Sequence, residues 1–360
     1  MKKLGLMAVA ALMMVACQNE NAYIVSGTYE AAAEGDSVSL QFVEGRRLVD
    51  YQKVPVVGGK FQFKGVADSV RIAAITVGDA FCQFFLEPGN IKVDMKRDQM
   101  SFALGTPNNN AYETFMSDMK ALEDEYAEIA AKTQSAELSD AQKAELKAQM
   151  SNFEGKYYQA IKNSIAENVG NDFGLYNLCN SYYHYTPEEL DTVLKAYIAA
   201  FPTNERLNKI KANNDLTLET AAGKQFKDFE MADVDGNMRM LSEYIAANEV
   251  TLVDFWASWC GPCRAEMPAV KAAYAAYKDK GFGIVGVSLD NSKEAWVNAI
   301  KGLGMDWAHL SDLQGWNCAA ARLYGVNSIP ATVLVAKDGT ILARNLRGEA
   351  IQEKLAEVLK

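Results

Sequence analysis

Histidine is scarce in this chain of 360 residues, and blocks of basic residues are missing. The only two histidines, His184 and His309, are far apart, and a single Cys-X-X-Cys pair is present. A structural zinc site needs two such pairs, or one pair with histidines at ligand spacing, so no metal site is expected. The net charge of −10, without a Lys/Arg block, is unfavourable for binding nucleic acid or an anionic membrane surface. After residue 15, no apolar run is long enough to span a bilayer.

The first 17 residues have the pattern of an export signal. Two lysines precede the apolar run 4–15, and a small residue and Cys17 follow. This run is too short for a transmembrane helix and is typical of a secretory signal. Residues 1–17 resemble a bacterial lipoprotein signal, cleaved before Cys17 and lipidated there. This implies a cell-envelope protein, facing the periplasm or on the surface, that meets the membrane only through its lipid anchor. Met14 stands where such signals usually have leucine, and plain secretion with an unmodified Cys17 is the alternative.

Three regions follow this signal. In residues 18–105, apolar and polar residues alternate between turn signals, which predicts a small antiparallel β domain of the sandwich type. In residues 106–222, apolar residues recur at three- and four-residue spacing, which predicts a helical region that begins after a linker at 106–110. Ser139 is the expected N-cap of one of its helices. In residues 223–360, strands alternate with helices, which predicts an α/β fold.

The chemistry is concentrated in the Cys-X-X-Cys pair. An apolar strand, 250–256, leads to Cys260-Gly-Pro-Cys263, and the amphipathic segment 264–280 follows. A Cys-X-X-Cys pair between a strand and a helix is a redox motif. Cys260 is placed at a helix N-terminus, where unpaired N–H groups and the helix dipole stabilise a thiolate, so it is the expected nucleophile. Cys263 lies one turn further on, close enough to resolve a mixed disulfide at Cys260 and form a redox-active disulfide with it.

The other cysteines do not form a second motif. Besides Cys17 and the pair, Cys82, Cys179 and Cys318 remain. An odd number excludes a complete disulfide framework among them. Cys82 and Cys179 lie in apolar segments and are expected to be buried as small hydrophobic residues. Cys318 lies in the redox region, where a third redox role is the alternative to burial.

The motif resembles the active site of thioredoxins, and other residues extend the resemblance. Trp259 precedes the pair, Pro268 stands where thioredoxins have a proline that kinks the helix, and Ile329-Pro330 precedes an apolar strand. The residues after the pair are similar to those of the TlpA/ResA subgroup. The resemblance covers residues 223–360 and implies a multi-domain protein with a C-terminal thioredoxin-like domain. It also implies an N-terminal β-rich domain of unknown function, as in other envelope lipoproteins of this type.

The resemblance also implies a substrate site. In thioredoxin-like folds a cis peptide faces the cysteines and leaves the backbone of the residue before the proline free to pair with an added strand of substrate. Here these residues are Ile329 and Pro330, and Trp259 is the expected neighbour that shields the site. An ordinary trans turn is the alternative for Ile329-Pro330.

Two carboxylates are candidates to accept the proton of Cys263. Asp254 lies six residues before Cys260, as does the buried acid of thioredoxins, and Glu266 lies three residues after Cys263, as does the active-site acid of TlpA/ResA proteins. A buried carboxylate with a raised pKa can act as a general base near neutral pH. A structural role for Asp254 and an exposed position for Glu266 are the alternatives. Strand 283–289 lacks the lysine that thioredoxins place near the buried acid.

The resemblance implies an envelope thiol–disulfide oxidoreductase that mainly reduces protein disulfides, since its Gly-Pro dipeptide is that of reducing thioredoxins. It implies protein thiol and disulfide substrates, no cofactor, and a membrane thiol reductase of the DsbD/CcdA kind as electron donor. A peroxiredoxin-like peroxidase is one alternative, although Ser258 stands at the wrong distance from Cys260 for that family's motif. A surface-binding lipoprotein, in which residues 18–222 carry the main role, is another.

Overall fold

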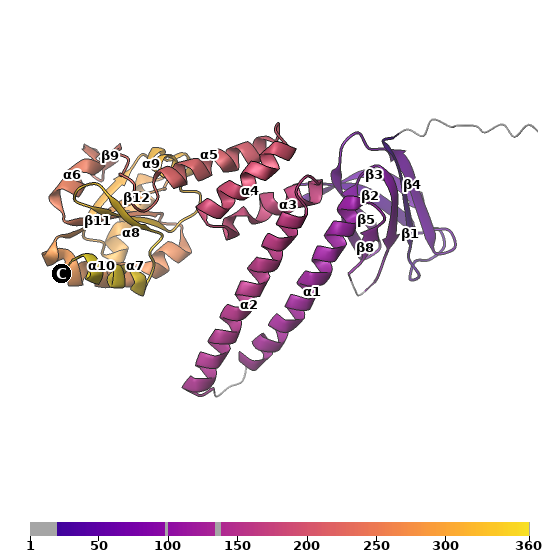
Figure 1. Cartoon of the computed structure of the whole chain (residues 1–360), viewed down its shortest axis with the longest axis horizontal. Helices are drawn as coiled ribbons and strands as arrows, with labels where there is room; N and C mark the ends of the chain where they lie inside the picture. The colour runs from indigo at the N-terminus through magenta and orange to yellow at the C-terminus, as the bar shows by residue number, and fades with distance from the viewer. Residues whose placement is uncertain (1–19, 98–99, 134–137, 360) are drawn as a thin grey trace, which may run out of the picture. The chain divides into compact units, whose positions relative to one another are not determined.

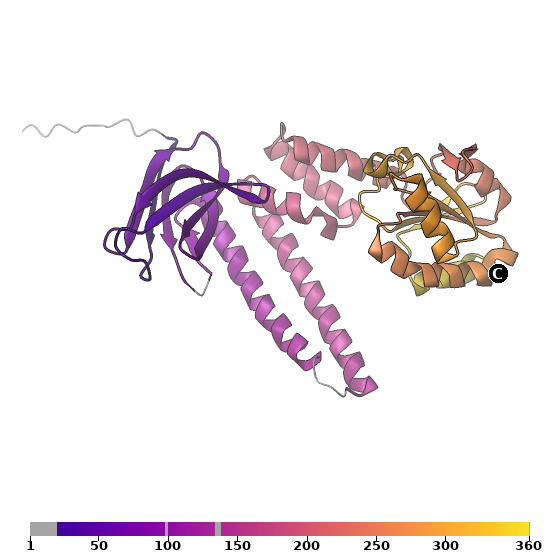
Figure 2. The same ribbon diagram turned by 180° about the vertical axis from the view of Figure 1, so that it is seen from behind.

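The computed structural model describes residues 20–97, 100–133 and 138–359 (Figures 1 and 2). The signal expected at 1–17, with Cys17, lies outside these residues. The chain divides into two compact units, with the boundary between His184 and Tyr185. The predicted helical region 106–222 is therefore divided between the two units. Within the described residues, no helix is both long enough and apolar enough to cross a membrane.

The first unit begins with two four-stranded sheets, in the strand orders β4-β1-β7-β8 and β3-β2-β5-β6. Alternate side chains of both sheets, such as Val25, Leu40 and Phe63, form one apolar core, which confirms a small β domain. The expectation of a purely antiparallel domain is wrong for one pair, because β7 returns parallel to β1 after the chain has crossed to the other sheet. The strands are β1 (Ala22–Thr28), β2 (Ser37–Glu44), β3 (Arg47–Pro55), β4 (Lys60–Val66), β5 (Arg71–Val77), β6 (Ala80–Leu86), β7 (Gly89–Asp94) and β8 (Phe102–Leu104).

Helix α1 (Pro107–Thr133) begins inside the expected linker 106–110, so that prediction is wrong. Asn109 is buried, and its side chain accepts a hydrogen bond from the Phe85 N–H and donates one to the Phe85 carbonyl, both at 2.8 Å. Asn108 is buried as well and donates to Glu87 at 2.7 Å. Asparagine is common in turns, but here it satisfies buried polar groups at the end of β6.

The remaining helices of the first unit are α2 (Asp140–Glu167), α3 (Asp172–Ser181) and the 3₁₀ turn η1 (Tyr182–His184). Ser139 caps α2 as predicted. Its hydroxyl accepts a hydrogen bond from the Gln142 N–H, and the Gln142 side chain accepts one from the Ser139 N–H in return.

The second unit contains one seven-stranded sheet, in the order β10-β9-β13-β12-β11-β14-β15. The interior strand β11 (Val250–Trp256) is buried along its whole length, parallel to β12 (Phe282–Ser288) and antiparallel to β14 (Ala331–Ala336). The predicted α/β fold is therefore confirmed. The other strands are β9 (Glu230–Asp233), β10 (Met238–Met240), β13 (Ala308–Ser311) and β15 (Ile341–Arg344). The helices are α4 (Pro187–Ala200), α5 (Glu205–Glu219), α6 (Leu241–Ala247), α7 (Gly261–Tyr277), α8 (Lys293–Leu303), α9 (Ala319–Leu323) and α10 (Glu349–Val358), with 3₁₀ turns η2 (Lys278–Lys280) and η3 (Gly315–Asn317).

Candidate active site

Cys260 and Cys263 form a disulfide at the start of α7, with 5.3 Å between their Cα atoms. The apolar strand β11 leads into the turn that contains Cys260. Pro262 suits the first turn of the helix because it has no N–H that would need a hydrogen-bond partner there. Cys260 is the N-cap residue, and its Sγ lies 3.1 Å from the Cys263 N–H. Its exposed fraction is only 4%, but that of Cys263 is 0%. Of the two sulfurs, that of Cys260 is therefore the one open to attack, and it has a helix N–H group aimed at it.

The peptide bond between Ile329 and Pro330 is cis, as predicted. The Ile329 carbonyl oxygen lies 3.8 Å from the Cys260 sulfur. This proximity follows from the sheet, because Ala331, the first residue of β14, pairs with Phe255 on β11. The carboxyl end of β11 and the amino end of β14 therefore place the disulfide and the cis-proline loop side by side.

Asp254 lies on β11, where it pairs with Thr332 of β14 and Gly286 of β12. Its side chain is buried, and its Oδ2 atom has no hydrogen-bond partner among the described residues. Burial raises the pKa of this carboxyl from 3.8 to about 7, and the Arg347 charge acts in the opposite direction. A carboxyl group with a pKa near neutrality can take up or release a proton at physiological pH.

Glu266 lies in the second turn of α7 and is half-buried rather than exposed. Its Oε2 atom accepts a hydrogen bond of 2.9 Å from the Gly348 N–H, in the turn before α10. Its charge also contributes to the raised pKa of Asp254. The two carboxylates selected from the sequence are therefore close enough to interact.

Arg347 is a residue of this site that the sequence did not reveal. Its guanidinium donates a hydrogen bond to the carbonyl oxygen of Pro330, and its positive charge lowers the pKa of Asp254. The sequence indicates no lysine on the strand next to the buried acid, and the positive charge comes instead from the turn after β15. No local pattern marks Arg347, because only the path of the C-terminal segment brings it to the cysteines.

A third carboxylate holds the turn that precedes the disulfide. The buried carboxylate of Asp290 accepts hydrogen bonds from the Ser258 N–H at 3.0 Å, the Ser258 hydroxyl at 2.5 Å and the Ser288 hydroxyl at 2.7 Å. The next residue, Trp259, is 54% exposed. Trp259 therefore lies at the surface directly beside Cys260, and its expected role in shielding the site stays a prediction.

Among the described residues, the cysteines outside this pair are Cys82, Cys179 and Cys318, and all three are buried, as expected for Cys82 and Cys179. Burial raises the pKa of the Cys82 thiol to about 12 and that of the Cys318 thiol to about 11. Since the thiolate is the reactive form, both groups are poor nucleophiles at neutral pH. For Cys318 the structure therefore favours burial over a third redox role.

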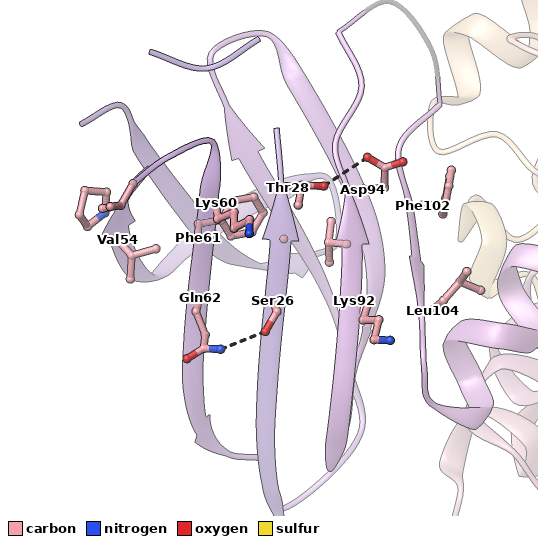
Figure 3. A pocket seen from close by; sticks show the side chains of 14 residues that line it. Ser26, Thr28, Val54, Lys60, Phe61, Gln62, Lys92, Asp94, Phe102 and Leu104 are labelled. Atoms are coloured by element: carbon pink, nitrogen blue, oxygen red, sulfur yellow. Dashed lines mark hydrogen bonds between the residues drawn. The ribbon is translucent and has the colours of Figure 1, made fainter. Parts of the chain in front are cut away.

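The first unit has a separate concave feature, a groove of about 950 Å³ on the sheet that contains β1. Figure 3 shows Lys60 and Lys92 on the two strands that flank β1 in this sheet, together with hydrogen bonds from Gln62 to Ser26 and from Thr28 to Asp94. Apolar side chains, including Phe102 and Leu104, line it as well. None of the residues selected from the sequence for catalysis lies in this groove.

A thioredoxin-like domain with a Cys-X-X-Cys disulfide at a helix N-terminus defines a thiol–disulfide oxidoreductase. The Redoxin family model matches residues 221–359, and a model described as a domain of unknown function, DUF4369, matches residues 23–112. Thiol-disulfide oxidoreductase ResA of Bacillus thuringiensis subsp. konkukian is 30% identical over 138 residues, which make up 38% of this chain and 76% of ResA. The chain therefore belongs to the ResA/TlpA family of thiol–disulfide oxidoreductases, and its N-terminal β domain fits the second model.

Two solved structures are similar to the second unit. A thiol-disulfide oxidoreductase from Bacteroides fragilis is 34% identical, with a TM-score of 0.36 and coverage of 38% of this chain and 100% of that chain. The thioredoxin domain of a thiol-disulfide oxidoreductase from Bacteroides vulgatus is 30% identical, with a TM-score of 0.36 and coverage of 39% and 99%.

Proposed function

We propose that this chain reduces disulfides of other proteins in the bacterial cell envelope, with Cys260 as the nucleophile and Cys263 as the resolving cysteine. The observation that carries the proposal is the position of Cys260, which caps α7 and has the greater exposure of the two. A thiolate at this sulfur is stabilised by the N–H of Cys263 and by the N-terminus of the helix.

The reaction starts from the dithiol form. The Cys260 thiolate attacks one sulfur of the substrate disulfide, forms a mixed disulfide and releases the other substrate sulfur as a thiolate. Cys263 loses its proton and attacks the Cys260 sulfur, which closes the Cys260–Cys263 disulfide and releases the second substrate sulfur. Two electrons pass from the dithiol to the substrate, and the structure has the disulfide of the final state.

Asp254 and Glu266 are the proposed acceptors for the proton of Cys263. The raised pKa of Asp254 suits a base that must also be reprotonated at neutral pH. Arg347 offsets the charge of Asp254, in the role that a lysine of the neighbouring strand has in thioredoxins.

Substrate binding is assigned to Ile329, Pro330 and Trp259. The backbone of Ile329 lies beside the Cys260 sulfur, where an extended substrate segment can pair with it. For the peroxidase alternative, Ser258 is unsuitable as a peroxide-binding hydroxyl, because it already donates to Asp290.

An electron donor must reduce the pair again, because each turnover leaves Cys260 and Cys263 oxidised. A membrane thiol reductase of the DsbD/CcdA kind fits this need in an envelope protein.

We further propose that Cys17 carries a lipid anchor, and that residues 18–105 and 106–222 position the redox domain 223–360 or select its substrates. Mass spectrometry of the mature N-terminus, with the Cys17→Ala variant as control, tests the anchor.

Reduction of insulin by the purified chain, with a dithiol supplying electrons, tests the function. The wild-type chain should accelerate reduction, Cys260→Ser should abolish it, and Cys263→Ser should accumulate mixed disulfides with substrate. A wild-type chain that oxidises reduced proteins but leaves insulin intact would overturn the proposed direction. A Cys263→Ser chain that traps no protein, alongside an active wild type, would overturn the division of roles between the cysteines.

A further inference from the structure

Two exposed tryptophans lie together beside the redox-active disulfide. Trp259 is 54% exposed and directly precedes Cys260, and Trp316 on η3 is 50% exposed. Their ring centroids are 6.1 Å apart, with 55° between the ring planes. Trp256 and Trp296, in contrast, are fully buried in the core of the same unit. Exposed aromatic side chains that gather next to a reactive group mark a binding surface, because tryptophan is enriched where partners bind.

Both tryptophans lie on turns that contact residues just after β12. The turn before Trp259 is held by Asp290, through the N–H and hydroxyl of Ser258. The turn before Trp316 packs against Asn291, the residue after Asp290. A Cβ atom added to Gly315 would lie only 2.4 Å from the Asn291 side-chain oxygen. Gly315 also has a φ of +56°, which favours glycine. The two rings are therefore positioned before any partner arrives, which lowers the entropy lost on binding.

Hydrogen bonds within the Trp316 loop occupy the carboxylate of Asp312. Asp312 accepts from the Gln314 N–H at 3.0 Å and from the Ala319 N–H at 2.9 Å. Asp290 is buried and occupied in the same way. The two exposed indole rings beside Cys260 therefore offer an apolar contact, which suits an apolar side chain of a substrate.

We propose that Trp259 and Trp316 together bind an aromatic or large aliphatic side chain that lies next to the cysteine of a polypeptide substrate. This inference rests on the proposed function and adds the class of substrate: extended polypeptide disulfides flanked by apolar residues. The substrate backbone pairs with Ile329 while its side chain packs against the indoles. Glutathione has no large apolar side chain and reaches only the cysteines. Trp316 is thus a specificity-determining residue on a loop that follows β13, far from the Cys-X-X-Cys motif in sequence.

The test uses the full chain and three disulfide substrates: a peptide with phenylalanine next to its cysteine, the same peptide with serine there, and oxidised glutathione. The wild type should prefer the phenylalanine peptide in kcat/KM by about three- to tenfold, the range expected for one aromatic contact. Trp316→Ala should lose most of this preference and keep the wild-type rate on glutathione. Trp316→Phe should retain most of it, and Met238→Ala, which removes another exposed apolar side chain of this unit, should change nothing.

Each other outcome counts against the inference. Equal rates of the wild type on the two peptides, or an unchanged preference in Trp316→Ala, would overturn it. A parallel loss on peptides and glutathione would show damage to the cysteines rather than lost recognition, and would overturn it too. If the wild type reduces none of the three substrates, the proposed function itself fails, and the inference fails with it.

Discussion

The guanidinium of Arg347 donates a hydrogen bond to the carbonyl of Pro330, so the turn before α10 is attached to the loop that faces the disulfide. The same positive charge lowers the pKa of Asp254. The next residue, Gly348, donates its N–H to Glu266. One turn of the C-terminal segment therefore contacts the cis-proline loop, places a positive charge near Asp254 and binds Glu266 through a backbone N–H.

Arg347→Gln should slow resolution of the mixed disulfide at neutral pH, because loss of the positive charge raises the pKa of Asp254 further and leaves less of it ionised. The effect should be about two- to tenfold near pH 7, since one pKa unit changes the ratio of ionised to protonated carboxyl tenfold. The pH profile of single-turnover insulin reduction should move to higher pH. Arg347→Lys, which keeps the charge, should leave the profile in place, and the distant Arg239→Gln serves as control. An unchanged pH profile in Arg347→Gln would show that this residue does not affect the loss of the Cys263 proton.

Asp254 should make stability depend on pH. Because burial raises its pKa from 3.8 to about 7, the folded chain keeps the proton where the unfolded chain has lost it. Its contribution is complete below the unfolded pKa and is lost as the pH rises through about 7. Asp254→Asn should therefore raise the free energy of unfolding by about 2–4 kcal/mol near pH 8 and change it little near pH 4. Denaturant unfolding of the oxidised protein at both pH values measures this. A gain of equal size at the two pH values would point to packing instead of ionisation.

A fragment that begins at Tyr185 should be more stable than one that begins at Gly223. Arg344 on β15 donates to the Thr220 carbonyl at 3.1 Å, and the Thr217 hydroxyl donates to the Gly325 carbonyl at 3.3 Å. Burial already lowers the pKa of Arg344 to about 10, so the guanidinium depends on such partners. Loss of a hydrogen bond to a buried charged group costs about 1.5–3 kcal/mol, which sets the expected difference in unfolding free energy.

Thermal and denaturant unfolding of the two fragments measure this difference. Arg344→Met in the longer fragment is a control without truncation, and it removes the hydrogen bond to Thr220 together with the one to the Tyr324 carbonyl. Equal stability of the two fragments would show that α4 and α5 are not part of the redox unit.

Residues next to the cysteines could be predicted from the sequence because local patterns define them. The apolar strand that ends at Trp256, the helix start at Cys260 and the proline at 330 each have a short-range signature, and the fold places them together as expected. The capping box at Ser139 is equally local, since a side chain and a backbone group three residues apart suffice to form it.

Features that depend on tertiary contacts could not be predicted in this way. Asn109 has the signature of a turn, but its amide pairs with the backbone of Phe85. Arg347 and Trp316 resemble ordinary residues of a loop and a short turn, and only the packing of β15 and η3 brings them to the site. The parallel pairing of β1 with β7 likewise depends on the path of the chain through the second sheet. The alternation of apolar residues predicts the strands but not this path.

The two acids should act in resolution and not in the first attack. Cys263 is fully buried and must lose a proton in this step, whereas the Cys260 thiolate is already stabilised by the helix N-terminus. Asp254→Asn should slow resolution strongly, within the range of about 10²–10⁴-fold that general-base catalysis supplies. Glu266→Gln should have a smaller effect, because its amide oxygen can still accept the Gly348 N–H, and the double change should exceed either single change.

Release of the second substrate thiol in a single turnover measures resolution, and alkylation of reduced Cys260 by iodoacetamide measures the first thiolate. Alkylation should stay near the wild-type rate in all three variants, which excludes general damage to the site. Since Asp254 is buried with a pKa near 7 and Glu266 is tied to a backbone N–H, the buried acid should dominate. If the double variant releases the second thiol at the wild-type rate while resolution limits turnover, neither carboxylate is the base. Both would then serve only to balance the charge of Arg347 and to hold α7 against the turn before α10.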